Sequence, residues 1–281
     1  MASLLKPGSG PLDYGRRWWL KTLFAVTYFV LYVPIITLIA FSFNTDKRGV
    51  VWRGFTLNNY SKAWANQDLI NAMLNSLTIA FIATIISTII GTMAAIVLWR
   101  FKFPGKGPYE AFMGLPIVIP EICMGVALLL FFNATGMMTG VVAMPWPLNL
   151  INIIIAHVAF CFPFVTVVVR SRLVGFNRQL EEASKDLGAT EFQTFSNVII
   201  PFMMPGIIAG ALLAFTLSLD DFVITFFTSG PETVTFPVKV YSLVRRGVSP
   251  EINAASTVLI VITILATVLA MKMQAPEKSG H

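Results

Sequence analysis

The chain has 281 residues, a formal net charge of +6, and only 12% charged residues against 56% hydrophobic ones. A soluble domain carries roughly 25% charged residues, so this chain has too little polar surface to cover a globule in water. The mean hydropathy of +0.75 therefore excludes a soluble enzyme or binding domain and indicates an integral membrane protein.

Apolar segments follow one another along the chain, each close to the roughly 20 residues that a helix needs to cross the hydrocarbon core. They cover residues 20–43, 72–98, 109–133, 148–169, 205–227 and 254–271. The sequence thus predicts an all-α integral membrane protein with one six-span domain. The domain covers residues 18–273, between a disordered N-terminus at 1–17 and a tail at 274–281. The first segment is too long for the apolar region of a signal peptide, which favours a retained span.

The distribution of Lys and Arg predicts the orientation of the spans. Arg100, Lys102 and Lys106 lie in one short loop, whereas the loop at 134–147 on the opposite side has no basic residue. This contrast places both termini in the cytoplasm. The positive charge then belongs to cytoplasmic loops. Because no basic cluster is interleaved with aromatic residues, we expect no nucleic-acid partner.

The third segment carries a glutamate, Glu121, about halfway along its length. A charged residue at the centre of a spanning helix costs roughly 2.5–3.5 kcal/mol, so it is seldom there without a function. Pro116 and Pro120 in the same segment predict bends, either for packing or around a polar path.

The chain has two cysteines: Cys123 lies in this third apolar segment and Cys161 in the fourth. Both are expected to be small buried side chains rather than disulfide or metal sites.

Residues 177–201 interrupt the apolar pattern between the fourth and fifth segments. Asn177 is suited to begin a short helix and Gly188 to end it. Thr190 and Gln193 then fit a capping box that begins a second helix. The stretch is therefore predicted to form a helix–turn–helix in the cytoplasm.

Charge decides what this helix–turn–helix contacts. Glu181 and Lys185 are spaced to pair on one side of the first helix, while apolar side chains lie on the other. Helices that lie on anionic lipid are normally rich in Lys and Arg, but here acidic residues predominate. We therefore expect a docking element for another protein.

The fifth segment carries two further acids, Asp220 and Asp221, toward its outer end. No Lys or Arg occurs deep in any span to pair with them. With Glu121, they are therefore candidates for holding a cationic ligand along a substrate path. The alternative is a set of capped or paired acids that hold helices together. His157, in the fourth segment, is interpreted as a hydrogen-bonded packing residue.

The cytoplasmic stretch resembles a known family motif. Glu182-Ala183-Ser184, Gly188 and Val198-Ile199-Ile200-Pro201 resemble the EAA loop of permease subunits in binding-protein-dependent ABC importers. The spacing matches at each landmark, and the departures at Ser184, Val198 and Ile200 keep size or apolarity. The resemblance implies that Glu182, Ala183, Gly188 and Pro201 belong to a helix that couples to an ATP-binding subunit.

The chain contains no phosphate-binding loop of its own. Gly105-Lys106 lacks both the upstream glycine and the following Ser or Thr that such a loop requires. ATP and Mg²⁺ are therefore expected in a partner chain. We expect no cofactor, no metal site and no catalytic residue here.

The C-terminal half resembles a narrower family. LAFTLSLDDFVIT and FPVKVYSLVRRGVSPEINA are similar to segments of spermidine/putrescine permeases, of the second of the two permease chain types. The resemblance implies the fold of a type I ABC importer permease in a bacterial inner membrane. It also implies four kinds of partner: membrane lipid, a homologous second permease, two ATP-binding subunits and a periplasmic polyamine-binding protein.

Other functions remain open at this point. An importer for a different solute, such as ferric iron or an opine, has the same architecture. An ion-driven secondary carrier would show internal repeats, which the sequence lacks. A structural membrane anchor would leave the acids within the spans unexplained.

Overall fold

The computed structural model describes residues 18–46, 51–138, 150–245 and 249–274. These residues are helical apart from their connections and one antiparallel bridge between Asn44 and Phe55. They fall into two compact units, which are taken separately here. One unit ends at Ala65 and includes the start of the last helix up to Val258. The other unit runs from Asn66 to Arg246 and continues from Leu259.

The first unit contains α1 (Trp18–Ser42), α2 (Asn58–Ala65) and the first turns of α12 (Pro250–Gln274). Ser42 is the only buried residue of α1, whose apolar side chains face outward on all sides, as suits a helix in lipid. Asn59 holds α2 to the end of α1, because its side-chain amide donates hydrogen bonds to the carbonyl oxygens of Ser42 (2.9 Å) and Asn44 (2.8 Å).

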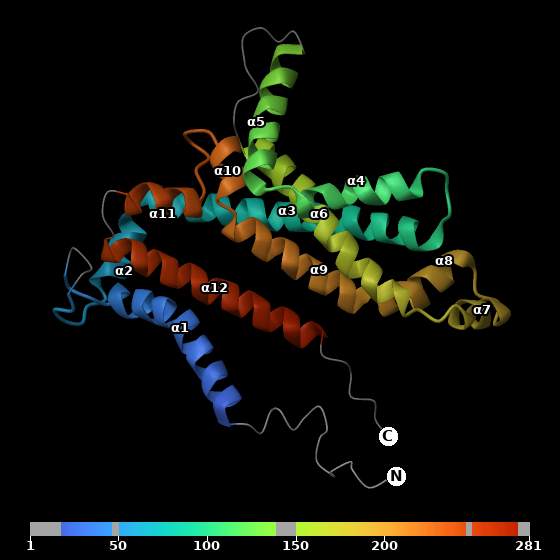
Figure 1. Ribbon diagram of the computed structural model, residues 1–281, viewed down its shortest axis with the longest axis horizontal. Coiled ribbons are helices and arrows are strands. Elements are labelled where there is room, and N and C mark those ends of the chain that lie inside the picture. Colours follow the sequence, from blue (N-terminus) through green and yellow to red (C-terminus); the bar gives the residue numbers. More distant parts are fainter. Residues whose placement is uncertain (1–17, 47–50, 139–149, 246–248, 275–281) are drawn as a thin grey trace, which may run out of the picture. The chain divides into compact units, whose positions relative to one another are not determined.

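Three long helices form the centre of the second unit: α3 (Gln67–Arg100), α6 (Leu150–Val174) and α9 (Ile200–Asp220), which pack against one another (Figure 1). Gly91 explains how closely α3 approaches α6. A Cβ atom at this position would lie 2.7 Å from Cβ of Val165 and 2.8 Å from the carbonyl oxygen of Phe162. Small residues at such crossings allow close helix packing within a membrane.

Apart from the part of α12 that begins at Leu259, the remaining helices of this unit are shorter. They are α4 (Lys106–Val118), α5 (Glu121–Met138), α7 (Gln179–Asp186), α8 (Glu191–Thr194), the π-helical turn η2 (Phe195–Ile199), α10 (Val223–Thr228) and α11 (Phe236–Val244).

Five helices in the described part of the chain are long and apolar enough to cross a membrane, and the bent pair α4 and α5 can supply a sixth span. The predicted bend at Pro120 is confirmed, because α4 and α5 meet at an angle of 108°. The cause is local. Ile119, immediately before Pro120, adopts an extended conformation (φ −70°, ψ 134°), as residues that precede proline prefer. Glu121 therefore begins a helix instead of lying in the middle of one.

The fifth span also differs from its predicted limits of 205–227. The helix runs from Glu191 through the π-helical turn and α9 without a break, and it ends at Asp220. At the π-helical turn the Ile200 amide donates to the carbonyl oxygen of Phe195, five residues earlier. This wider turn lets the helix accommodate Pro201, which has no amide hydrogen to donate.

Some predictions concern residues that the structure does not describe. The predicted N-terminus at 1–17, nearly all of the tail at 274–281 and most of the loop at 134–147 lie outside the described residues. Of the two cysteines, Cys161 is buried as expected. Cys123 is exposed, so its predicted burial is wrong.

Candidate functional site: a helical hairpin and an acidic junction

Residues 177–201 form a helical hairpin in which the predicted caps are confirmed. Asn177 Oδ1 accepts a hydrogen bond from the amide of Gln179 at the start of α7 (3.0 Å). Thr190 Oγ1 accepts from the amide of Gln193 (3.3 Å), and Gln193 Oε1 accepts from the amide of Thr190 (2.8 Å). These bonds satisfy backbone amides that have no partner within the helix.

Gly188 makes the turn between the two helices of the hairpin. Its φ of +87° lies in the left-handed region, which costs other residues roughly 1–2 kcal/mol. No other atom lies within 4 Å of the place where a Cβ would stand. The need for glycine therefore comes from the backbone angle and not from lack of space.

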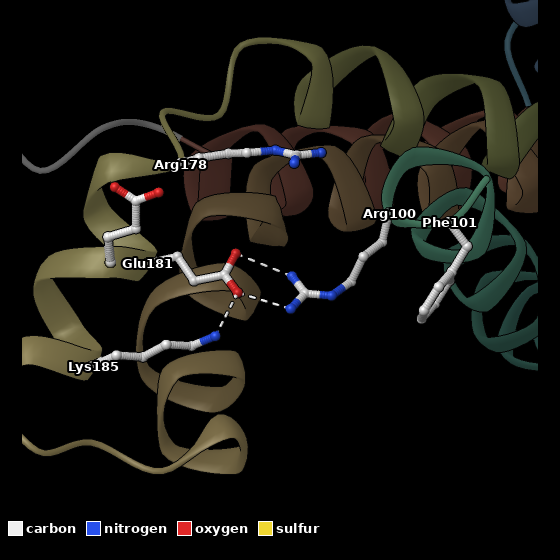
Figure 2. Close-up of a pocket in the computed structure, with 6 residues that line it drawn as sticks. Arg100, Phe101, Arg178, Glu181 and Lys185 are labelled. Atoms are coloured by element: carbon white, nitrogen blue, oxygen red, sulfur yellow. Dashed lines mark hydrogen bonds and ion pairs between the residues drawn. The ribbon is translucent and has the colours of Figure 1, made fainter.

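The inner side of the hairpin is joined to the end of α3. Arg100 donates from Nη1 to Glu181 Oε2 (3.0 Å) and from Nη2 to Glu181 Oε1 (2.8 Å), as Figure 2 shows. The predicted pair between Glu181 and Lys185 is confirmed at 3.2 Å, and Lys185 also lies 2.6 Å from Glu191. The sequence analysis missed Arg100 as a partner, because it lies 81 residues from Glu181 and no local pattern joins them.

Electrostatics keep this cluster charged. The hydrogen bonds from Arg100 are the main reason that the pKa of Glu181 is lowered to about 2, against the opposing effect of partial burial. Hydrogen bonds to Glu191 and Glu181 raise the pKa of Lys185. Glu181 is therefore ionised throughout the physiological range, and its side chain is only 11% exposed.

The outer side of the hairpin has no covering element among the described residues. Leu187 is 90% exposed and Phe192 is 77% exposed. Glu182, Ala183 and Pro201 are also exposed. The hairpin thus exposes apolar side chains and a carboxylate, a composition suited to a protein partner.

The other end of α9 holds the predicted acid pair, and the two acids differ. Asp221 is 3% exposed at its side chain. It accepts hydrogen bonds from the amide of Ile224 (3.3 Å) and from the amide and hydroxyl of Thr225 (both 2.8 Å). It therefore caps α10, and its two carboxylate oxygens are engaged by the protein itself.

His157 supplies a further partner for Asp221. Its Nε2 lies 3.4 Å from Asp221 Oδ2 and 2.9 Å from the Thr225 hydroxyl, and its Nδ1 lies 2.7 Å from the Ser218 hydroxyl. The interpretation of His157 as a hydrogen-bonded packing residue is confirmed. The expectation that Asp221 lacks a partner within the spans is therefore wrong, since His157 is neither Lys nor Arg but lies beside it. The geometry favours a structural role for Asp221.

Asp220 and Glu121 are both exposed. Asp220 is the last residue of α9, and Glu121 is the first residue of α5. Their carboxylates are within range of an electrostatic interaction, which is weaker than the effect of burial on Asp220. The hairpin lies at the opposite end of α9, about 30 Å away for a helix of 21 residues.

Comparison with known proteins agrees with this architecture. Residues 87–275 match the family described as binding-protein-dependent transport system inner membrane component. The chain is 41% identical over 266 residues to the spermidine/putrescine transport system permease protein PotC of Haemophilus influenzae, covering 94% of this chain and 99% of that one. It is also 41% identical over 248 residues to the putrescine transport system permease protein PotI of Escherichia coli, covering 87% and 86% of the two chains.

Solved structures share the fold at low sequence identity. A bacterial ABC transporter that imports the acidic polysaccharide alginate gives a TM-score of 0.74 at 17% identity over 95% of this chain and 98% of that one. The MetNI methionine ABC transporter in an inward-facing conformation gives a TM-score of 0.59 at 18% identity, covering 73% and 94% of the two chains. The chain belongs to the family of binding-protein-dependent transport system inner membrane components and has the multi-pass helical fold of ABC importer permeases.

Proposed function

We propose that this chain is a permease subunit of an ATP-driven importer that moves polyamines from the periplasm to the cytoplasm by alternating access. The observation that carries the mechanism is the helical hairpin. The hairpin exposes Leu187, Phe192 and Glu182, while Glu181 is ion-paired to Arg100 at the end of α3. Such a surface suits a joint through which a separate motor protein acts on the membrane helices.

The motor is proposed to be a pair of ATP-binding subunits, which hold ATP and Mg²⁺. This chain carries no phosphate-binding loop, so it performs no covalent chemistry in this scheme. A homologous second permease completes the membrane pathway, and a periplasmic binding protein delivers the substrate. The names of the relatives, which describe spermidine and putrescine transport, support the choice of substrate.

Glu121 and Asp220 are proposed to face the translocation path and to hold the ammonium groups of the amine. Both carboxylates are exposed and are within range of an electrostatic interaction. A dication that enters between them replaces water and gains charge-assisted hydrogen bonds. Binding at this point must stay weak enough for release to the cytoplasm.

The test is reconstitution of the complete transporter. The chain is purified with its co-eluting subunits, placed in vesicles with a loaded binding protein, and assayed for ATP hydrolysis and for uptake of labelled putrescine and spermidine. We expect amine uptake that depends on ATP. ATP-dependent uptake of ferric iron or an opine without amine uptake would reject the substrate, whereas uptake driven by an ion gradient without ATP would reject the mechanism.

Orientation is tested by cysteine labelling. Cys123 is exposed and is first replaced by serine, while Cys161 is buried. Single cysteines at Asn58 and Glu232 are expected to react with an impermeant thiol reagent in intact cells, because both positions are exposed and belong to predicted periplasmic loops. A cysteine at Asp186 on the hairpin is expected to react only after lysis. Labelling of that position in intact cells would contradict a cytoplasmic hairpin.

A further inference from the structure

The end of α3 and the start of the hairpin are joined by more than one contact. We propose that Arg100 is a positioning residue that fixes the hairpin to α3 through its ion pair with Glu181. Movement of the hairpin is then transmitted along α3 to the opposite end of the membrane domain. This inference rests on the proposed function, in which a motor protein moves the hairpin.

The geometry of the Arg100–Glu181 pair fixes both distance and orientation. Two parallel hydrogen bonds of 3.0 and 2.8 Å join the guanidinium to the two oxygens of one carboxylate. The carboxylate is only 11% exposed and the arginine side chain 33%. A bidentate pair resists rotation, whereas a lysine in the same place would act as a single point charge.

A second contact prevents the hairpin from pivoting about this pair. The guanidinium of Arg178, directly before α7, lies 5.7 Å from the ring centroid of Trp99 on α3. The Trp99 ring also packs edge-on against Phe176, with ring centroids 5.6 Å apart. Phe176 before Arg178 and Glu181 after it thus hold the chain entering the hairpin to the last turn of α3. Figure 2 shows Arg178, Glu181 and Arg100 around one pocket.

The last turn of α3 is itself held in place. The ammonium group of Lys106, on α4, donates hydrogen bonds to the carbonyl oxygens of Leu98 and Phe101. These carbonyls lie at the end of the helix, where the backbone leaves acceptors without partners. The last turn of α3 is therefore kept helical, so a displacement of the hairpin that pulls on Arg100 is passed to the whole helix.

The opposite end of α3 is joined to α11. Lys239 lies 2.8 Å from Asp68, and Ser76 Oγ accepts a hydrogen bond of 2.8 Å from the amide of Phe236. Asn75 donates to the carbonyl oxygen of Val234 (3.2 Å). A helix of 34 residues spans about 50 Å, so α3 links the hairpin to α11 across the length of the unit.

The experiment compares variants in the assembled transporter. Arg100→Glu places a carboxylate against Glu181. Arg100→Lys keeps the positive charge but cannot form the two parallel hydrogen bonds of a guanidinium. The double variant Arg100→Glu, Glu181→Arg restores an opposite-charge pair. The matched control is Glu110→Gln, which removes the 3.0 Å ion pair between Glu110 on α4 and Arg170 on α6. This pair is of similar length, its carboxylate is more exposed (33% against 11%), and it does not involve the hairpin.

The readout is the amount of labelled putrescine taken up per ATP hydrolysed. Arg100→Glu is expected to lower this ratio about ten-fold, the factor that corresponds to loss of a hydrogen-bonded charge pair. Arg100→Lys is expected to lie between Arg100→Glu and the unmodified protein. The double variant should recover most of the loss, and Glu110→Gln should leave the ratio unchanged. An unchanged ratio in Arg100→Glu, or an equal loss in Glu110→Gln, would overturn the proposal.

A second measurement does not depend on transport. Hydrogen exchange of the α7 amides is expected to be faster in Arg100→Glu than in the unmodified protein, and unaltered in Glu110→Gln. If Arg100→Glu does not assemble, the same comparison is made with the isosteric Glu181→Gln. Equal hydrogen-exchange rates of the α7 amides in all variants would overturn the proposal that Arg100 fixes the hairpin to α3. Failure of the unmodified complex to take up amines would instead count against the proposed function.

Discussion

Two pairs of adjacent acids, Glu181-Glu182 in the hairpin and Asp220-Asp221 at the end of α9, divide their roles in the same way. In each pair one carboxylate is buried and bonded to other residues of the protein, and its neighbour is exposed. Glu181 is held by Arg100, and Asp221 is held by Thr225 and His157. Each of these two acidic doublets therefore contains one structural residue and one residue that is exposed to a partner.

The two doublets reach this division differently. Glu181 and Glu182 lie on one helix, where successive side chains point about 100° apart. Glu181 reaches Arg100, whereas Glu182 stays exposed at the edge of the same pocket. Between Asp220 and Asp221 the helix ends. Asp221 has an extended backbone (φ −62°, ψ 126°) and turns its carboxylate onto the start of α10. Predictions that separate the members of each doublet test whether the division is real.

The largest effect is expected for Asp221→Ala. Removing one partner of a buried pair typically costs about 3–5 kcal/mol, because it leaves His157 and the α10 amides without their acceptor. We expect a sharp loss of folded protein, measured as yield and thermal unfolding in detergent. Asp220→Ala is the matched control and should change the free energy of unfolding by less than about 0.5 kcal/mol. Equal losses in the two variants would contradict the division of this doublet.

The next largest effect is expected for Glu182→Lys. Reversing a charge on a docking surface should weaken binding of the ATP-binding subunits on the order of a hundredfold. Because Glu182 is exposed, the permease itself should still insert and fold. Co-purification of the ATP-binding subunits and amine uptake are the measurements. Normal amine uptake in this variant would contradict a role of Glu182 and the hairpin in coupling to the ATP-binding subunits.

A smaller effect is expected along the substrate path. Glu121→Gln and Asp220→Asn keep shape and remove charge, so each should lower amine uptake about ten-fold, the value of one charge-assisted hydrogen bond. Subunit assembly and basal ATP hydrolysis should remain close to normal. Should both variants transport amines at the normal rate, neither acid would be a substrate ligand, and loss of assembly would instead point to helix pairing.

The smallest effect concerns pH. The pKa of Glu181 is lowered from 4.5 to about 2, so its contribution to stability is complete above about pH 4.5 and is lost as pH falls through the folded-state value. Arg100 and Lys185, the cations that face this carboxylate, keep their charge over that range, and Glu191 faces Lys185 from the second helix of the hairpin.

The measurement is the difference in thermal stability between the unmodified protein and Glu181→Gln. This difference should be constant from pH 5 to 8 and should shrink below about pH 4.5. A difference that changed markedly between pH 6 and 8 would mean that another titrating group controls the pair.

Local features of the fold were predictable because the responsible residues lie close together in sequence. Hydropathy predicted the spans, and the caps at Asn177 and Thr190 fixed the start of each hairpin helix to within a few residues. The positive φ of Gly188 followed from its place after a helix. The break at Pro120 was also local, and the rule for residues before proline contained the signal.

By itself the sequence determined that this is a helical membrane protein with a capped helical hairpin between two spans and three acids within or near its spans. Only the tertiary structure decided which acid of each doublet is engaged. Arg100 reaches Glu181 across 81 positions, and His157 reaches Thr225 across 68. The reason is physical: caps and hydropathy depend on neighbours within one or two helical turns, whereas an ion pair between elements depends on how α3, α6 and α9 pack.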